Sequence, residues 1–183
     1  LFGKRKHRTG AEQSSRLPHL SGDPLASLLA TYDPDADLGP EGAADLGAKL
    51  RAMQEDNERR GVIDGRLYPM LRKLEAEAGL VRGRHYTEWI PTLDELRSSG
   101  DDDTALTLLW ECIQAAERAA RVAGTSPAPG YTKRAAVIYR RRKDYAREIE
   151  VMERWEAAAP PGYRGAMADR LAVARKLQEK QQA

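Results

Sequence analysis

The stretch YRRRKDYAREIEVMERW, which runs from Tyr139 to Trp155, decides the fold. Four consecutive basic residues, Arg140–Lys143, end at Asp144, and apolar side chains then recur three or four residues apart, at Tyr145, Ile149 and Met152. This spacing places the apolar side chains on one face of a helix. The basic run therefore precedes a predicted helix, and it is either a nucleic-acid handle or one rim of a helical hairpin.

A similar pattern occurs 43 residues earlier in the chain. When Gly100-Asp101 is aligned with Lys143-Asp144, apolar positions coincide on both sides of the turn. The aligned pairs are Leu93 with Ala136, Leu96 with Tyr139, Ala105 with Glu148, Leu106 with Ile149, Leu109 with Met152 and Cys112 with Trp155. Two helix–turn–helix units are therefore predicted. Each has an apolar face that it cannot bury alone, so the units are expected to stack.

Helical spacing also predicts helices on both sides of these units. Apolar residues recur at helical intervals over 41–60, over 66–79 and near the end of the chain, and no run alternates in the way that a strand does. The prediction is an all-α protein of stacked antiparallel helical hairpins. Its expected segments are a basic flexible tail at 1–24, an N-terminal helical segment at 25–83, two hairpins at 84–160 and a C-terminal capping helix at 161–183.

Composition limits the classes of protein that remain. A chain of 183 residues with 41% hydrophobic and 32% charged residues can form a core under a well-solvated surface. The net charge of +2 is too small to require a polyanionic partner. A single cysteine, Cys112, excludes an internal disulfide and a cysteine-rich metal site. No transmembrane segment and no signal peptide is expected, which favours a cytoplasmic location.

The two units resemble tetratricopeptide repeats, in which a Gly-Asp-Tyr-like turn joins two helices and a proline follows the second helix. The matching residues of the first unit are Trp89, Leu93, Leu96, Gly100-Asp101, Ala105 and Leu106. Those of the second are Ala136, Tyr139, Lys143-Asp144-Tyr145, Ile149 and Pro160. The period here is longer than that of the family, and Glu148 and Trp155 occupy positions where the family has small residues.

In that family the first helix of each unit lines a concave face, so the resemblance implies a groove here. The residues expected to bind a partner in it are Arg97, Lys133, Val137, Arg140 and Arg141, with Ile90 and Asp94 beside them. Residues 84–124 hold eight acids and four bases, whereas residues 131–154 hold four acids and eight bases. The groove is therefore expected to be basic in its second half and to suit a protein, an acidic peptide or a terminal carboxylate.

A simpler interpretation of Arg140–Lys143 remains open. A run of charges is commonly solvated, and some of these side chains would then pair with Asp144, with Glu148 or with the acidic turn at Asp101–Asp103. Glu148 is interpreted as an internal partner of an arginine rather than as a catalytic acid, because an unpaired buried carboxylate is costly.

No residue set in the sequence indicates catalysis. Cys112 lies within an apolar stripe and is interpreted as a packed thiol. His7 and His19 belong to the tail, and His85 stands alone, so no histidine pair has the spacing of a metal site. The chain contains no glycine-rich phosphate loop and no nucleophile elbow. No enzyme activity, cofactor or metal is expected.

One further resemblance concerns the stretch LYPMLRKLEAEAGLV, residues 67–81, which is similar to the recognition-helix segment of PadR-type winged-helix regulators. After this stretch the sequence is expected to enter another helix directly, without two wing strands. The sequence therefore predicts a non-enzymatic protein-interaction module. The alternatives are a DNA-binding regulator and a structural component of a larger assembly.

Overall fold

The computed structural model describes residues 22–32 and 37–183, and the chain divides into two compact units at Asp37 and Leu38. The described part of the first unit is the short helix α1 (Pro24–Leu29) with its flanking residues. Asp23 caps this helix, since its carboxylate accepts a hydrogen bond of 3.0 Å from the backbone N–H of Leu25. The predicted basic tail lies almost entirely outside the described residues.

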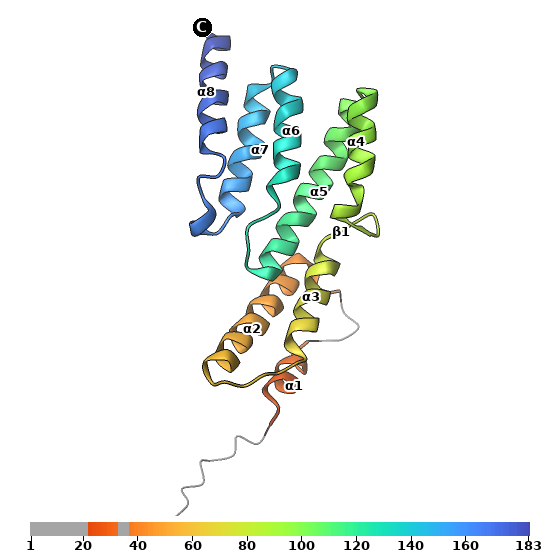
Figure 1. Cartoon of the computed structure of the whole chain (residues 1–183), viewed down its shortest axis with the longest axis vertical. Coiled ribbons are helices and arrows are strands. Elements are labelled where there is room, and N and C mark those ends of the chain that lie inside the picture. Colours follow the sequence, from red (N-terminus) through yellow and green to blue (C-terminus); the bar gives the residue numbers. More distant parts are fainter. Residues whose placement is uncertain (1–21, 33–36) are drawn as a thin grey trace, which may run out of the picture. The chain divides into compact units, whose positions relative to one another are not determined.

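The second unit, residues 38–183, is almost wholly helical, which confirms the all-α fold (Figure 1). In chain order its elements are α2 (Gly39–Arg59), α3 (Leu67–Ala78), β1 (Leu80–Val81), β2 (Arg84–His85), the 3₁₀ turn η1 (Tyr86–Trp89), α4 (Ile90–Ser99), α5 (Asp102–Ala123), α6 (Pro129–Arg141), α7 (Tyr145–Ala158), the 3₁₀ turn η2 (Pro161–Tyr163) and α8 (Ala168–Gln182). Helices α2 and α3 begin and end within two residues of the predicted 41–60 and 66–79, whereas α8 begins seven residues after the start of the predicted segment 161–183.

The expectation that the chain passes from residues 67–81 directly into another helix, without two strands, was wrong. β1 and β2 pair antiparallel, with Val81 opposite Arg84. Arg82 and Gly83 between them both have positive φ, 49° and 78°, as the turns of tight hairpins require. Two residues per strand are too few to produce an alternating pattern, so no strand could be predicted here. Arg118 of α5 fixes the approach to this hairpin by donating to the carbonyl of Leu80 at 2.9 Å.

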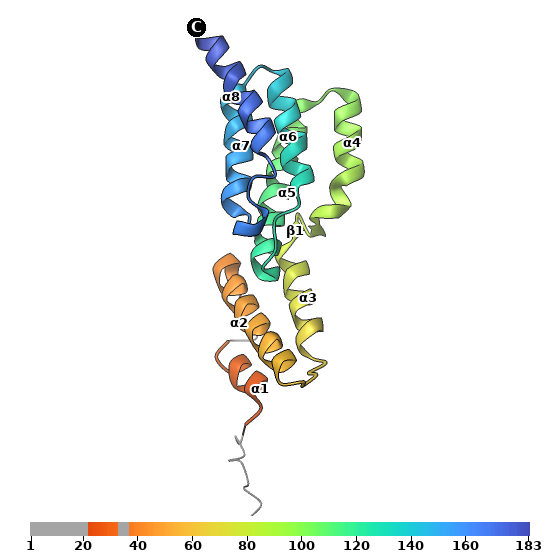
Figure 2. The same ribbon diagram turned by 60° about the vertical axis from the view of Figure 1, so that its left-hand side comes forward.

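Helix α5 is the centre of the second unit. Figures 1 and 2 show α4 and α6 beside its first turns and α2 and α3 beside its C-terminal part. Helix α2 approaches closely because Gly47 has no side chain: a Cβ there would lie 2.8 Å from the carbonyl oxygen of Val122. The guanidinium of Arg51, also on α2, donates to the carbonyls of Arg121 and Val122 and so satisfies the end of α5.

The turns α4–α5 and α6–α7 have the same backbone geometry. In each, the residue before the aspartate has positive φ, and the aspartate both bonds back to the preceding helix and caps the next one. In the first turn, φ is 75° at Gly100. The N–H of Asp101 donates to the carbonyl of Leu96 at 3.0 Å, and the N–H of Thr104 donates to the Asp101 carboxylate at 3.1 Å. For the second they are φ of 57° at Lys143, Asp144 N–H to Tyr139 O at 2.9 Å and Arg147 N–H to the Asp144 carboxylate at 3.1 Å.

Aromatic side chains join the helices through hydrogen bonds from their indole groups. The indole N–H of Trp110 donates to the hydroxyl of Tyr139 at 2.8 Å, which connects α5 to α6. The indole N–H of Trp155 donates to the carbonyl of Pro127 at 3.0 Å, which holds α7 against the loop before α6. The first of these bonds fixes α5 against α6, two of the helices that line the candidate site.

Candidate functional site

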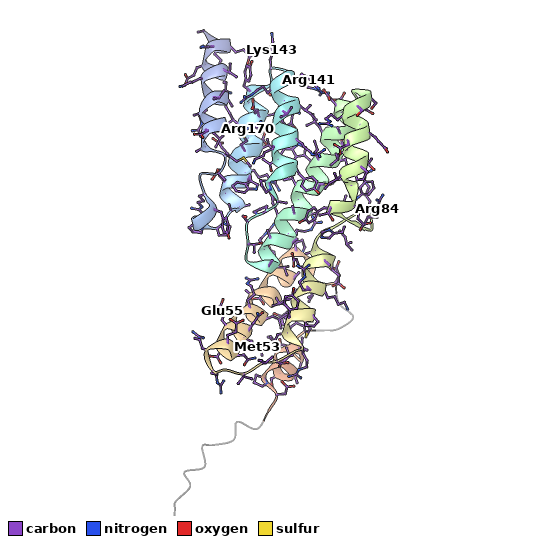
Figure 3. All side chains as sticks on the ribbon, viewed as in Figure 1. Met53, Glu55, Arg84, Arg141, Lys143 and Arg170 are labelled. Carbon is purple, nitrogen blue, oxygen red and sulfur yellow. The ribbon has the colours of Figure 1, made fainter. Side chains whose placement is uncertain are left out.

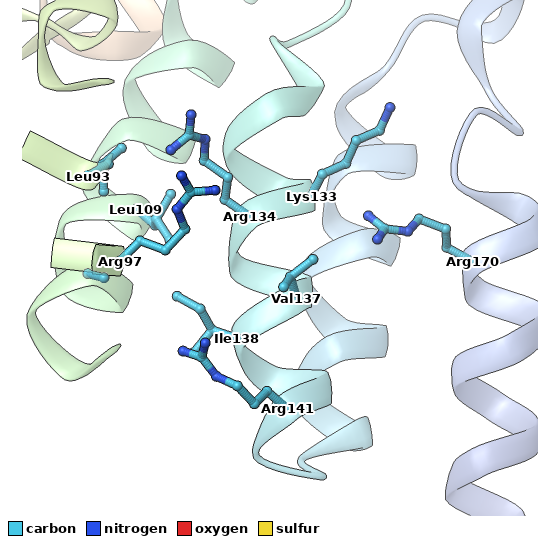
Figure 4. Close-up of a pocket in the computed structure, with 10 residues that line it drawn as sticks. Leu93, Arg97, Leu109, Lys133, Arg134, Val137, Ile138, Arg141 and Arg170 are labelled. Carbon is cyan, nitrogen blue, oxygen red and sulfur yellow. The ribbon is translucent and has the colours of Figure 1, made fainter. Parts of the chain in front are cut away.

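A pocket with a volume of about 310 Å³ lies where α4, α5, α6 and α8 meet (Figure 4). Its lining divides into an aliphatic floor and a set of cations, and it contains no carboxylate and no aromatic ring. The floor residues are Leu93, Ala105, Leu109, Val137 and Ile138, and the cations are Arg97, Lys133, Arg134, Arg141 and Arg170.

The floor of the pocket is an opening onto the hydrophobic core. Leu93 of α4 and Leu109 of α5 are each only 2% exposed, and both belong to the main core cluster. Val137 of α6 is 50% exposed and therefore offers a free aliphatic surface at the same place. A ligand that covers Val137 would remove apolar area from water, which favours binding.

The cations gather on two sides of Val137. Figure 4 shows the guanidinium groups of Arg97, Arg134 and Arg141 on the α4 side, whereas Lys133 and Arg170 extend into the space between α6 and α8. Figure 3 shows where Arg141 lies on α6 and where Arg170 lies on α8. The residues on either side come from helices far apart in the sequence.

The two sides differ in their ion pairs. On the α4 side, Asp94 lies 2.8 Å from the guanidinium of Arg134 and 3.8 Å from that of Arg97, and Asp102 pairs with Arg141. Among the residues that the structure describes, no carboxylate lies within ion-pair distance of Lys133 or Arg170. The α8 side therefore has the greater excess of positive charge.

The structure brings four of the five predicted residues together, since Arg97, Lys133, Val137 and Arg141 all line the pocket. Arg140 does not. Its guanidinium turns to Glu148, with Nη2 2.6 Å from Oε1 and Nε 3.1 Å from Oε2. Glu148 is 1% exposed, so its carboxylate requires a cation inside the fold. The placement of Arg140 in the groove was wrong, and the interpretation of Glu148 as an internal partner is confirmed.

Two further residues of the basic run, Arg141 and Arg142, also find carboxylate partners within the fold. Arg141 pairs with Asp102, and Arg142 lies 2.7 Å from Asp103. Both carboxylates belong to the first turn of α5, so the basic end of α6 is attached to the acidic start of α5. The pairing that the simpler interpretation expected is therefore confirmed for these residues.

Sequence reasoning missed Arg134 and Arg170. The spacing could have revealed Arg134, because it lies three residues before Val137 and seven before Arg141, on the same stripe of α6. No local signal could have revealed Arg170. It reaches the pocket only because α8 packs on α7, and this is a contact between distant segments.

The basic side chains of the hairpin after α3 make contacts within the fold, although they remain about half exposed. Arg82 pairs with Glu111, its Nη2 lying 2.5 Å from Oε1. The guanidinium carbon of Arg84 lies 4.6 Å from the centre of the Trp89 ring, which is a cation–π contact. On α3 itself, Arg72 lies 2.8 Å from Glu75.

The remaining reactive groups are built into the core. Cys112 is fully buried, and desolvation raises the pKa of its thiol to about 11, so it is the packed thiol that the sequence predicted. Burial likewise raises the pKa of Tyr131 to about 12, and its hydroxyl donates to the carbonyl of Tyr86 at 3.1 Å. In residues 22–32 and 37–183, no group of three or more His, Cys, Asp or Glu side chains is placed to hold a metal ion.

Comparisons of the chain with protein-family models, with curated proteins and with solved structures found no match. Among the described segments, no helix has the length and apolar character needed to cross a membrane.

Proposed function

We propose that this chain is a non-enzymatic interaction module that binds an acidic segment of a protein partner in the pocket between α4, α5, α6 and α8. The pocket itself carries the proposal, because five cations surround an aliphatic floor. Charge-assisted hydrogen bonds from arginine and lysine favour carboxylates, and the floor favours apolar side chains. A protein segment supplies both kinds of group within a few residues.

The repeated turns support an interaction module of the tetratricopeptide type. Their similar geometry, 43 residues apart, supports the interpretation of α4–α5 and α6–α7 as repeated hairpins. Stacked hairpins of this kind place first helices side by side, and such surfaces commonly bind extended segments. The pocket lies on α4 and α6, the first helices of the two hairpins, and on α8, which follows them.

A DNA-binding regulator is the second candidate, and the strands β1 and β2 favour it because winged-helix proteins have a hairpin at this place. Its basic side chains argue against it. Arg82, Arg84 and Arg72 are engaged by Glu111, Trp89 and Glu75 within the fold. Lys133 and Arg170 of the pocket, in contrast, have no carboxylate within ion-pair distance among the described residues, so the pocket offers the less neutralised cations.

A direct binding experiment tests the proposal. The full chain would be titrated with three end-blocked peptide pools of equal length, one acidic, one neutral and one basic, and with a short DNA duplex, at a salt concentration of about 0.15 M. We expect binding of the acidic pool alone. We also expect Lys133→Glu/Arg170→Glu to abolish this binding.

The matched control is Lys176→Glu/Lys180→Glu, which changes the net charge equally on exposed residues of α8 outside the pocket. It should retain binding of the acidic pool. Equal loss in both double variants would mean that net charge alone attracts the peptides, and the pocket would not be the site. Binding of the duplex in preference to the acidic pool, with steep salt dependence, would support the regulator instead.

A further inference from the structure

The two ends of the pocket carry different excess positive charge. The pocket therefore specifies where the carboxylates of its ligand must lie, and not only that the ligand is acidic. We infer that it takes an extended segment with an aliphatic side chain at its centre, two carboxylates toward α8 and one toward α4. This inference rests on the proposed function, because it describes what the same pocket selects.

The charges set the two ends. On the α4 side three cations, Arg97, Arg134 and Arg141, face two carboxylates, those of Asp94 and Asp102, which leaves an excess of one positive charge. On the α8 side Lys133 and Arg170 leave an excess of two, because no carboxylate of the described residues pairs with them. Opposite charges across an interface fix orientation more than they add affinity.

The centre of the pocket is aliphatic. Val137 is half exposed, Ile138 is 8% exposed, and Leu109 lies beneath them. An aliphatic side chain of the ligand placed here would cover Val137 and continue the core of the protein. None of the ten lining residues is aromatic, so the pocket lacks the stacking surface that single-stranded nucleic acid needs.

The size of the site follows from the spacing of the helices. Packed helices lie roughly 8–10 Å apart, so a ligand that reaches from α4 across α6 to α8 crosses two such spacings and spans at least roughly 16–20 Å. An extended chain advances about 3.3 Å per residue and covers this span with about five or six residues. The ligand is therefore a short segment, and its acidic and aliphatic residues must be close together in sequence.

The test uses the isotope-labelled full chain and an end-blocked peptide with the sequence Asp-Asp-Ser-Leu-Ser-Asp, titrated by nuclear magnetic resonance. Blocked ends ensure that no terminal carboxylate contributes. We expect replacement of the peptide leucine by serine to weaken binding at least about fivefold, because the aliphatic contact is lost. Val137→Thr should weaken binding of the parent peptide about threefold, since it keeps the shape but adds a hydroxyl.

Two further variants make the test specific. Val173→Thr changes an exposed valine of α8 that does not line the pocket, and it should leave binding unchanged. Asp94→Asn removes the carboxylate that holds Arg97 and Arg134, so it should tighten binding about twofold to threefold. Circular dichroism of each variant would verify that the fold is retained.

The outcomes separate this inference from the proposed function. If the serine peptide binds as tightly as the leucine peptide, or if Val137→Thr has no effect, the central aliphatic contact is wrong and only acidity is recognised. If Asp94→Asn weakens binding, the assignment of the two ends is wrong. If no acidic peptide binds at all, the proposed function fails with it. Full competition by inorganic phosphate at equal concentration would reduce the pocket to a general anion site and overturn the inference.

Discussion

Arg97 and Arg140 occupy the same position of the repeated pattern, 43 residues apart, and they have opposite roles. The side chain of Arg97 is 70% exposed and lines the pocket. That of Arg140 is 35% exposed and turns away from the pocket to a carboxylate that is 1% exposed. Equal backbone positions therefore do not give equal side-chain directions.

The two arginine side chains point in different directions because of the residue eight positions after each arginine, which lies on the next helix. In the first unit this position is Ala105, which offers no charge, so Arg97 remains free to face the solvent. In the second unit it is Glu148, which is buried and needs a cation. The difference between Ala105 and Glu148 therefore determines whether the arginine side chain faces the solvent or pairs with a buried carboxylate.

The largest effect is expected from Arg140→Ala. This change leaves the carboxylate of Glu148 buried without its cation, and breaking a buried pair in this way costs about 3 kcal/mol. The free energy of unfolding, measured in urea with the slope unchanged, should fall by this amount. The equivalent change Arg97→Ala should cost less than about 0.5 kcal/mol, because that side chain is exposed.

A double variant sharpens this comparison. Arg140→Met/Glu148→Met replaces both partners with apolar side chains of similar size, and it should recover most of the stability lost in the single variant. If Arg140→Ala lowers the free energy of unfolding no more than Arg97→Ala does, the ion pair does not stabilise the fold. The two arginines would then differ in position but not in their contribution to stability.

The helices could be predicted from the sequence because their signals are local. Apolar spacing, the aspartates at the turns and the prolines after residue 158 predicted the helices from α2 to α7 with small errors at their ends, whereas α8 begins seven residues after the start of the predicted segment 161–183. The strands β1 and β2 could not be predicted, because each contributes only two residues. They depend on Arg82 and Gly83 at positive φ and on the contact of Arg118 with the carbonyl of Leu80.

The pocket could be predicted only in part. Arg97, Lys133 and Arg141 followed from the helical stripe and from the family resemblance. Arg140 lies on the same stripe, but its side chain points to Glu148 on the next helix. The sequence alone does not give the distance between these two residues. Arg170 comes from α8, whose position depends on how the helices pack.

The two turns give the next prediction, because Gly100 and Lys143 share a left-handed backbone. At Gly100 the φ is 75°, and a Cβ would meet no atom within 4 Å, so only the backbone opposes a side chain. Gly100→Ala should therefore lower the free energy of unfolding by about 1 kcal/mol. Urea denaturation would measure it, and an unchanged midpoint would show that this turn tolerates any residue.

The reverse exchange in the second turn should have a smaller and opposite effect. Lys143 has a φ of 57°, which is unfavourable for a residue with a Cβ. Lys143→Gly removes that cost, although the unfolded chain gains freedom, so we expect stabilisation of only about 0.5 kcal/mol. Lys143→Ala is the control for the lost charge and should not stabilise the protein. Stabilisation by alanine equal to that by glycine would assign the effect to the side chain of lysine instead.

The smallest expected effect is the pH dependence that Asp101, in the first turn, gives to the stability of the protein. Hydrogen bonds from Thr104 lower the pKa of Asp101 below its ordinary value of 3.8. As the pH falls, the unfolded chain therefore takes up this proton before the folded chain does, and the contribution of Asp101 to stability disappears as the pH passes through the lowered pKa. Asp101→Asn keeps a capping side chain that does not titrate.

The difference in melting temperature between the wild type and Asp101→Asn should be constant above about pH 5 and should move in favour of the variant as the pH falls below about 4. Asp64, whose pKa is lowered to about 2 by Arg66, titrates in both proteins and so cancels from the difference. A difference that stays constant over the whole range would show that the carboxylate is equally protonated in both states. The cap at Asp101 would then act through its geometry alone, as a neutral side chain does.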